Sequence, residues 1–232
     1  MEPTERTEDE ARVTQTNRES EAPEARGAQA TRRRLLAAAE DVFATRGYHQ
    51  ATVDDIVRAA QSSKGAFYFH FANKEAVFLA LVEAFAQSLL LDIFAAVERE
   101  SGAKRRVEAA LYAGVEAFAA RPRLSRIFLV EAVGLNPAFE AKRREIYAAF
   151  ARLIRGYLDQ AVADGDLPPL DTELAAYGWL GAIGEVVVRY LDGQDAQALR
   201  KRVPELARFA LRAVGWSESE IPRGIQEPSS GV

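Results

Sequence analysis

A group of small, basic and hydroxyl-bearing side chains stands just after a break in the apolar pattern of the chain. Its members are Ser63, Lys64, Gly65, Ala66, Tyr68 and His70. Hydroxyl and ammonium groups donate hydrogen bonds to phosphate oxygens, and short side chains let a helix backbone come close to base edges. No nucleophile stands beside a base in this group, so its chemistry is that of binding rather than catalysis. A surface of this kind suits a groove of DNA.

Two short helices must position this group. Thr52 and Asp55 supply the N-cap and its partner for a helix that runs to about residue 60, and Ser63 can cap a second helix that runs to about residue 71. The inward faces of the two helices carry the apolar residues Val53, Ile56, Val57, Ala60, Phe67 and Phe71. Because these residues recur at helical spacing, they predict a helix, a tight turn and a second helix.

This stretch resembles the DNA-binding domain of the TetR family of bacterial transcriptional regulators. The resemblance is carried by the runs GYHQATVDDIVRAA and SSKGAFYFHFANKEAVFLALVE and covers about residues 28 to 90. In that family the second helix of the helix-turn-helix enters the major groove, and two copies on a dimer read the halves of an inverted repeat. One departure concerns the turn, where the family usually has Gly-Val and this chain has Gln61-Ser62. We therefore expect a left-handed residue other than glycine there, and a slightly strained or differently shaped turn.

The resemblance also implies a role for each residue of the motif. Thr52 would contact phosphate at the start of the first short helix, and Arg33 would belong to a basic first turn of the preceding helix. The groups expected to hold the DNA backbone are Lys64, Tyr68, His70 and Lys74, and those expected to face base edges are Ser63, Gly65 and Ala66. Taken singly, each of these fits an ordinary solvated face, but together and in order they favour DNA binding. For Arg33, contact with phosphate or a minor groove and a plain solvated turn stay open as equal alternatives.

The amino-acid composition limits which classes of protein this chain can belong to. The 232 residues are 48% hydrophobic and include no cysteine, which excludes disulfides, thiolate nucleophiles and cysteine metal sites. The only histidines are His49 and His70, so we expect no metal and no cofactor. We expect no apolar run near the roughly 20 residues that span a bilayer, and the N-terminus is acidic and polar. These features predict a cytoplasmic protein without a membrane partner.

The formal charge of −4 is unevenly distributed. Residues 1–30 hold eight acidic and four basic groups, whereas residues 31–75 hold seven basic and five acidic groups. Since exposed charges are screened beyond about 10 Å at ordinary salt, only the field of the second stretch acts on a bound phosphate. Its small positive excess predicts modest non-specific affinity for DNA.

The periodicity of the whole chain predicts an all-α protein with two domains. An N-terminal three-helix helix-turn-helix DNA-binding domain (28–74) would be followed by a larger helical ligand-binding and dimerisation domain (75–215). Residues 1–27 lack apolar periodicity and predict a disordered tail, and residues 216–232 predict a polar tail. The helices of the larger domain are expected at about 73–100, 104–120, 124–135, 139–163 and 172–191, with a last one opened by Pro204 and stopped by Gly215.

The larger domain contains aromatic and polar residues that could line an apolar cavity. They are Phe118, Phe128, Glu131, Tyr147, Phe150 and Tyr157. Each alone is better explained as plain core, but the resemblance favours a cavity because the family binds small effectors in this region. The domain has no phosphate loop, no paired catalytic carboxylates and no metal spacing, so we expect no enzyme activity.

Interior glycines of the helix near 172–191 cost roughly 1 kcal/mol each relative to alanine. Such a cost is easier to understand if another helix must come close. The resemblance implies that the last two helices pair with their copies in a second chain, although a bundle face within one chain is the alternative. The residues expected at the dimer interface are Gly178, Gly181, Ala182, Glu185, Leu206, Phe209 and Ala213.

The leading hypothesis is a homodimeric, ligand-responsive transcriptional repressor. It would bind an inverted-repeat operator in double-stranded DNA and be released by a small apolar or amphipathic effector. A diffuse resemblance to the TetR-like proteins that respond to fatty acyl thioesters makes such compounds a candidate effector class. A helical small-molecule or lipid carrier, an activator, and a regulator without ligand stay open as alternatives.

Overall fold

The computed structural model describes residues 5–131, 134–192 and 196–217, with side chains from residue 26 onward except at 131, 192 and 196. Every regular element within these ranges is a helix, which confirms the all-α prediction. The chain divides into two compact units, Met1–Phe78 and Leu79–Val232, called unit 1 and unit 2 below. The division falls inside the first turns of the helix that was expected to follow the DNA-binding domain.

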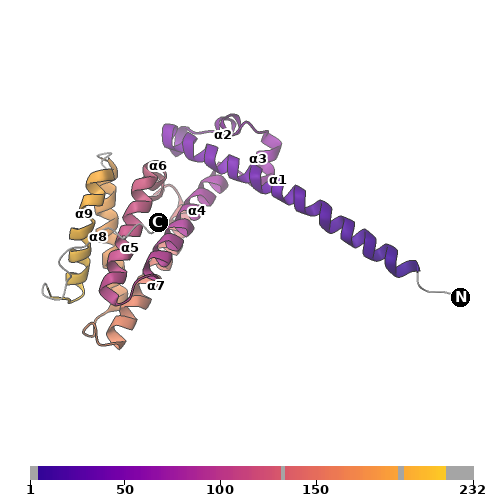
Figure 1. Ribbon diagram of the computed structural model, residues 1–232. Coiled ribbons are helices and arrows are strands. Elements are labelled where there is room, and N and C mark those ends of the chain that lie inside the picture. Colours follow the sequence, from indigo (N-terminus) through magenta and orange to yellow (C-terminus); the bar gives the residue numbers. More distant parts are fainter. Residues whose placement is uncertain (1–4, 132–133, 193–195, 218–232) are drawn as a thin grey trace. The chain divides into compact units, whose positions relative to one another are not determined.

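Unit 1 contains α1 (Glu5–Gln50), α2 (Val53–Ala59) and α3 (Lys64–His70). Figure 1 shows α2 and α3 beside the C-terminal part of α1, which both contact. The backbone of α1 begins earlier than its apolar stripe predicts, in a stretch rich in the good helix formers Glu, Ala and Arg. Gly47 interrupts this helix, with a left-handed φ of 71°. The side chains before residue 26 lie outside the described residues, and the disordered tail stays a prediction.

The turn between α2 and α3 closes with the paired hydrogen bonds of a Schellman motif. The Ser62 N–H donates to the Val57 carbonyl at 3.0 Å, and the Gln61 N–H donates to the Arg58 carbonyl at 3.2 Å. This motif needs a left-handed residue directly after the cap, and Gln61 occupies that position with φ of 49°. The expectation of a left-handed residue other than glycine is therefore confirmed. Among the described residues, Gln61 is the only such residue that is not glycine.

The helix α4 (Lys74–Val97) is, by length and composition alone, apolar enough to cross a membrane. The sequence-based expectation that no segment reaches that length was therefore wrong. Some of the apolar side chains along the helix are buried within the units, whereas Leu91 and Phe94 are exposed. The side chains at most 5% exposed include Val77, Phe78, Leu81, Val82, Phe85 and Leu89.

Unit 2 is a bundle of long helices (Figure 1). After α4 it contains α5 (Ala103–Ala120), α6 (Pro122–Arg126), a π-helical turn η1 (Ile127–Glu131), α7 (Pro137–Ala163), α8 (Thr172–Asp192) and α9 (Ala196–Ala213). The turn η1 replaces most of the α-helix expected over 124–135, and 132–133 lie outside the described residues. Asn136 caps α7 through its side-chain oxygen, and Gly165 turns the chain with φ of 81°.

The last helix differs from the expectation, because Pro204 lies inside α9 instead of opening it. Proline has no N–H, so the carbonyl of Arg200, four residues earlier, receives no helical hydrogen bond from that position. The side chain of Arg200 anchors the same turn to α5 through two bonds to the Glu116 carboxylate, at 2.6 and 2.8 Å. Val203 and Ala207, on either side of the proline, are buried in the core of unit 2. Packing and this ion pair together compensate for the missing backbone bond.

Replacing Gln61 with glycine is expected to stabilise the protein. The left-handed backbone costs a residue with a Cβ atom roughly 1–2 kcal/mol, while glycine adds back about 0.5–1 kcal/mol of chain entropy. Gln61→Gly should therefore raise the free energy of unfolding by up to about 1 kcal/mol in urea denaturation. Gln61→Ala is the matched control, since it removes the side chain but keeps the Cβ atom and should bring no such gain. Equal stability of the two variants would contradict strain at this turn.

Candidate nucleic-acid interface and ligand cavity

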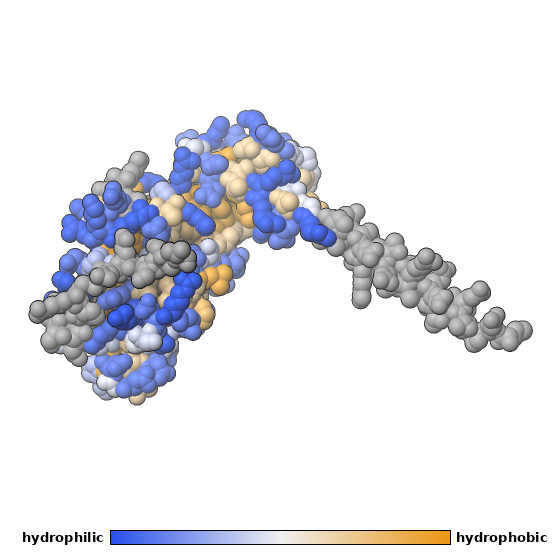
Figure 2. Space-filling view, in the orientation of Figure 1, coloured by the Kyte–Doolittle hydropathy of each residue, from blue (hydrophilic) through white to orange (hydrophobic). Residues whose placement is uncertain are grey.

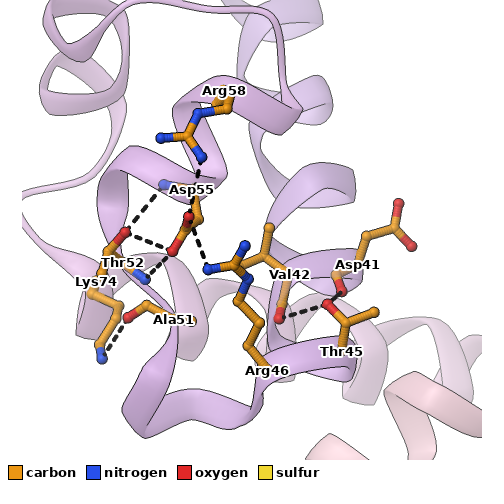
Figure 3. A network of polar contacts seen from close by, with 9 residues as sticks. All are labelled: Asp41, Val42, Thr45, Arg46, Ala51, Thr52, Asp55, Arg58 and Lys74. Carbon is orange, nitrogen blue, oxygen red and sulfur yellow. Dashed lines mark hydrogen bonds and ion pairs between the residues drawn. The ribbon is translucent and has the colours of Figure 1, made fainter.

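A network around Asp55 fixes the start of α2 against the end of α1 (Figure 3). The carboxylate accepts hydrogen bonds from the Thr52 hydroxyl at 2.7 Å and the Thr52 N–H at 3.2 Å, and the hydroxyl accepts the Asp55 N–H at 3.2 Å. This is the capping box predicted from the sequence. Arg46 of α1 and Arg58 pair with the same carboxylate at 3.1 and 3.6 Å. The Thr52 hydrogen bond, helped by the two guanidinium groups, lowers the pKa of Asp55 below its ordinary value.

The Lys74 ammonium lies against the backbone that leads from α1 to α2. It donates to the carbonyls of Tyr48 at 2.7 Å, Ala51 at 2.9 Å and His49 at 3.3 Å, and it lies 4.4 Å from the centre of the Tyr48 ring. An ammonium group has three N–H donors, and these carbonyls use all of them. In this arrangement Lys74 ties the start of α4 to the end of α1. Its expected grip on the DNA backbone stays a prediction and would require breaking these bonds.

The outer side of α3 begins with Ser63 and Lys64. Ser63 caps the helix by accepting the Ala66 N–H at 3.1 Å, as the sequence predicted, and its hydroxyl proton stays available for a further acceptor. The Lys64 ammonium pairs with Asp54 of α2 at 2.8 Å, and both side chains are more than half exposed. The hydrogen bond and charge of Asp54 raise the pKa of Lys64. Sequence reasoning missed Asp54, which phosphate would have to displace.

Gly65 is exposed on α3, and no contact among the described residues requires its lack of a side chain. A Cβ atom there would meet only the Ser63 hydroxyl oxygen, at an ordinary contact distance of 3.8 Å. Its backbone is helical, so a glycine costs about 1 kcal/mol relative to alanine without any gain inside the fold. The missing side chain leaves open space at the surface of α3.

Aromatic residues extend the same surface. Tyr68 is 56% exposed, and its neighbour Phe69 is 76% exposed, a feature the sequence reasoning did not single out. The His70 ring is half-buried and packs edge-on against Phe69 at 4.9 Å between centroids. Phe67, by contrast, is fully buried in unit 1. A stretch of successive aromatic residues does not reveal which rings point outward, and that is why Phe69 was overlooked.

The structure thus brings part of the expected DNA-binding group to one exposed surface. Ser63, Lys64, Gly65 and Tyr68 are exposed on or beside α3, and Ala66 is half-buried. Thr52 is exposed but uses its hydroxyl in the capping box. Arg33 is exposed on α1, where the structure favours neither of its two alternatives.

Unit 2 contains a partly open cavity of about 360 Å³. Five of the six residues expected around a cavity lie on its wall, namely Phe118, Phe128, Tyr147, Phe150 and Tyr157. The sixth, Glu131, lies outside the residues with described side chains. The turn η1 contributes Phe128 and Leu129, consistent with the frequent occurrence of π turns at functional sites. Figure 2 shows orange, apolar patches that interrupt the blue surface of unit 2.

Polar groups of the wall are tied to one another. The Tyr157 hydroxyl donates to Glu98 at 3.0 Å, and the Arg106 guanidinium lies 5.6 Å from the centre of the Tyr157 ring. Burial, followed by the hydrogen bond to Glu98, raises the pKa of Tyr157 above its ordinary value. Arg106 also donates through Nε to the Glu100 carbonyl at 3.2 Å. Sequence reasoning missed Arg106, because a basic residue in a first helical turn looks like an ordinary solvated group.

Two tryptophans also lie on the cavity wall, and the sequence reasoning assigned neither of them to it. Trp179 comes from α8, and Trp216 follows α9. Trp216 was placed in the polar tail, whereas the structure buries it to 3% exposure. Gly215 turns the chain with φ of 109°, and the Trp216 N–H then donates to the Leu211 carbonyl at 3.3 Å. The glycine that ends the helix thus returns the next side chain to the core.

An apolar stripe on α8 faces away from the core of unit 2. Leu174 and Tyr177 are 70% and 44% exposed, and Gly178 and Gly181 have no atom of the chain within 4 Å of where a Cβ would stand. On α9, Phe209 is 53% exposed. Other expected interface residues, Glu185 and Ala213, are exposed, and Ala182 is half-buried. Leu206 differs, because it is only 8% exposed and belongs to the core of the unit.

Lys74→Met is expected to destabilise unit 1. The methionine keeps the apolar stem but leaves three backbone carbonyls without their donor, which should lower the free energy of unfolding by about 1–3 kcal/mol. Lys64→Met is the control, because its exposed ion pair with Asp54 contributes at most about 1 kcal/mol. Thermal and urea denaturation measure both variants. If Lys74→Met kept wild-type stability and lost only DNA affinity, the positioning role of Lys74 would be wrong.

Comparison with known families supports this geometry. The family model described as bacterial regulatory proteins of the tetR family matches residues 35–81, which span α2 and α3. The HTH-type transcriptional regulator SrpR of Pseudomonas putida is 31% identical over 176 residues, covering 74% of this chain and 80% of that protein. A fatty acid metabolism regulator protein of Bacillus subtilis is 25% identical over 176 residues, covering 74% of this chain and 91% of its own length.

Solved structures share the fold. The transcriptional regulator FadR of Bacillus subtilis, in complex with stearoyl-CoA, superposes with a TM-score of 0.71 at 22% identity, over 78% of this chain and 97% of that one. At that identity the likeness speaks for the arrangement of helices alone. Both units of the chain therefore have counterparts in one known architecture.

Proposed function

Because the chain belongs to the TetR family of bacterial regulatory proteins, we propose that it is a transcriptional repressor that binds an inverted-repeat operator as a homodimer. A small apolar or amphipathic effector in the cavity of unit 2 releases it from DNA. The observation that carries the DNA-binding part is Gly65, an exposed helical glycine beside which the described residues leave open space. Close approach of a DNA groove supplies the reason for it.

The exposed stripe of α8 and α9 supports the homodimer. Leu174, Tyr177, Gly178 and Gly181 recur at a spacing of three or four residues, so they share one face of α8. Apolar residues left exposed along one face mark an interaction site, and glycines on that face allow a second helix to come close. A copy of the same chain is the partner that pairs α8 and α9 with themselves across a two-fold axis.

The cavity supports the effector. Its volume of about 360 Å³ falls in the range of small-molecule sites, and its wall is mostly aliphatic and aromatic. Relatives with fatty acid regulation and stearoyl-CoA in their names make fatty acyl thioesters the first class of effector to test. The acyl part is the portion that suits such a wall.

For an effector to act, ligand binding must change the same conformational equilibrium that controls DNA binding. The helix α4 contributes Phe78 to the buried residues of unit 1 and Leu89, Ile93 and Val97 to the cavity wall of unit 2. A ligand that prefers one position of this helix shifts the population between an operator-binding and a non-binding dimer. The shift is limited by the difference in the ligand's affinity for the two states.

Selection of bound duplexes from a random library by the purified protein tests the DNA-binding proposal. We expect an inverted repeat whose half-site centres lie about 10 base pairs, or a multiple of this, apart. Gly65→Ala should weaken binding to that repeat about tenfold or more, equivalent to about 1.4 kcal/mol, because the new methyl group occupies the space left for the groove. The same change should stabilise the fold by up to about 1 kcal/mol.

Gly156→Ala is the matched control for this experiment. Gly156 is also an exposed helical glycine with no atom near a would-be Cβ, and it lies on α7 of unit 2. The Gly156→Ala variant should gain the same stability as Gly65→Ala and keep wild-type affinity for the operator. Enrichment of no sequence at low salt, or unchanged affinity in Gly65→Ala, would overturn the proposal.

Phe209→Glu is expected to convert the dimer to a monomer. A charge at the centre of an apolar interface must lose its hydration when the dimer forms, which weakens the dimer. Because Phe209 is half exposed, the same change should leave the core of the monomer intact. Leu91→Glu is the control, because Leu91 is an equally apolar side chain, 68% exposed, on α4. Sedimentation equilibrium should show a dimer for the wild type and for Leu91→Glu, and a monomer for Phe209→Glu. A dimeric Phe209→Glu would place the interface elsewhere.

A further inference from the structure

The large apolar side chain with the highest exposure among the described residues belongs to Phe69, which is 76% exposed. It lies in the last turn of α3. Successive residues of a helix are rotated by about 100° around its axis, so Phe69 is rotated by about 200° from Phe67, two residues earlier. Because Phe67 is fully buried, the Phe69 side chain projects almost directly away from the core of unit 1.

Gly65 shares this outward face of α3. It precedes Phe69 by four residues, which places it within about 40° of Phe69 around the helix axis. A Cβ atom at Gly65 would meet only the Ser63 hydroxyl oxygen. The side of α3 that lies opposite Phe67 therefore presents bare helix backbone and, one turn later, a phenyl ring.

Hydrogen-bond donors accompany the ring on the exposed surface of α3. The Lys64 ammonium lies in the first turn, and Tyr68, which carries a hydroxyl group, is 56% exposed. The Ser63 hydroxyl proton is available for a further acceptor. Ammonium and hydroxyl groups bind the phosphates that border a groove of DNA. This combination of donors and one projecting ring favours a DNA duplex over a wholly apolar partner.

The major groove offers an apolar group to such a ring. Each base pair presents hydrogen-bond donors and acceptors there, and thymine adds its C5-methyl group. A phenyl ring has no donor or acceptor of its own, so it distinguishes base pairs through that methyl group. Resting on the DNA-binding part of the proposed function, we infer that Phe69 is a specificity-determining residue that packs against a thymine methyl group in each half-site of the operator.

This assignment changes which residue of α3 reads the sequence. Of the small residues expected to face base edges, Ala66 is half-buried, and Ser63 uses its oxygen to cap the helix. Gly65 lets the backbone come close to the bases but has no side chain that could select one of them. Phe69 has the reach that these three residues lack, and it supplies a preference for thymine.

The test replaces thymine with deoxyuridine, which lacks only the methyl group. Operator duplexes selected by the full-length wild type carry one replacement at a time, and their affinities are measured by fluorescence anisotropy. We expect wild-type affinity to fall about 3- to 5-fold at one position of the half-site, because one buried methyl group is lost there. Phe69→Ala should bind the thymine operator more weakly and show no further loss at that position.

Phe94→Ala is the matched control. Phe94 is a half-exposed phenylalanine on α4, so the variant loses the same ring from a different helix. It should keep the wild-type affinity and the wild-type response to deoxyuridine. Phe69→Ala should keep the wild-type melting temperature, since the Phe69 ring is mostly exposed, and weaker binding then does not reflect unfolding. Selection repeated with Phe69→Ala should recover the inverted repeat without the thymine preference at that position.

The outcomes separate this inference from the function on which it rests. Recovery of no duplex by the wild type would overturn the proposed function and this inference together. An operator that the wild type binds without loss at any deoxyuridine, or whose losses all persist in Phe69→Ala, would overturn the role of Phe69 alone. Unchanged operator affinity in Phe69→Ala would also overturn it and would leave the ring for contact with another protein.

Discussion

Burial of the aromatic side chains in unit 1 is the constraint on which the exposed surface of α3 depends. Phe43 and Phe78 meet edge to face with ring centroids 5.1 Å apart, and Phe67 of α3 is as fully buried as they are. Because α3 has only seven residues, this one side chain largely decides which way the helix is turned. Once Phe67 is inside, Gly65 and Tyr68 must be outside. The capping box of α2 and the Lys74 ammonium then hold the neighbouring backbone in place.

Unit 2 follows a different rule, since its helices bury most of their apolar surface and still leave a cavity. The bundle holds the small residues Gly114 and Ala110 where α5 faces the cavity, and the π turn η1 adds Phe128 and Leu129 at another part of the wall. A cavity in a helical core lacks packing contacts, and it therefore destabilises the fold unless a bound ligand restores those contacts.

The two faces of α9 show how one helix serves the core and the surface together. Val203 and Ala210 are buried within the unit, whereas Phe209, one residue from Ala210, is half exposed. Its partner helix α5 is joined to it through the ion pair of Glu116 with Arg200. The hydrogen bond and charge of Arg200 lower the pKa of the Glu116 carboxyl. Helix α9 thus tolerates Pro204 while Phe209 stays exposed on its outer face.

The sequence by itself determined the helical class, the helix-turn-helix and the cap residues. These features depend on local rules, namely helical periodicity, capping chemistry and left-handed turns, which short stretches express directly. Only the tertiary structure decided which apolar residue on a helix faces the core, as for Leu206 and Phe209. It also decided that Trp216 folds back onto the cavity and that Lys74 bonds to backbone carbonyls. Those outcomes depend on neighbours distant in the chain, and no local pattern encodes them.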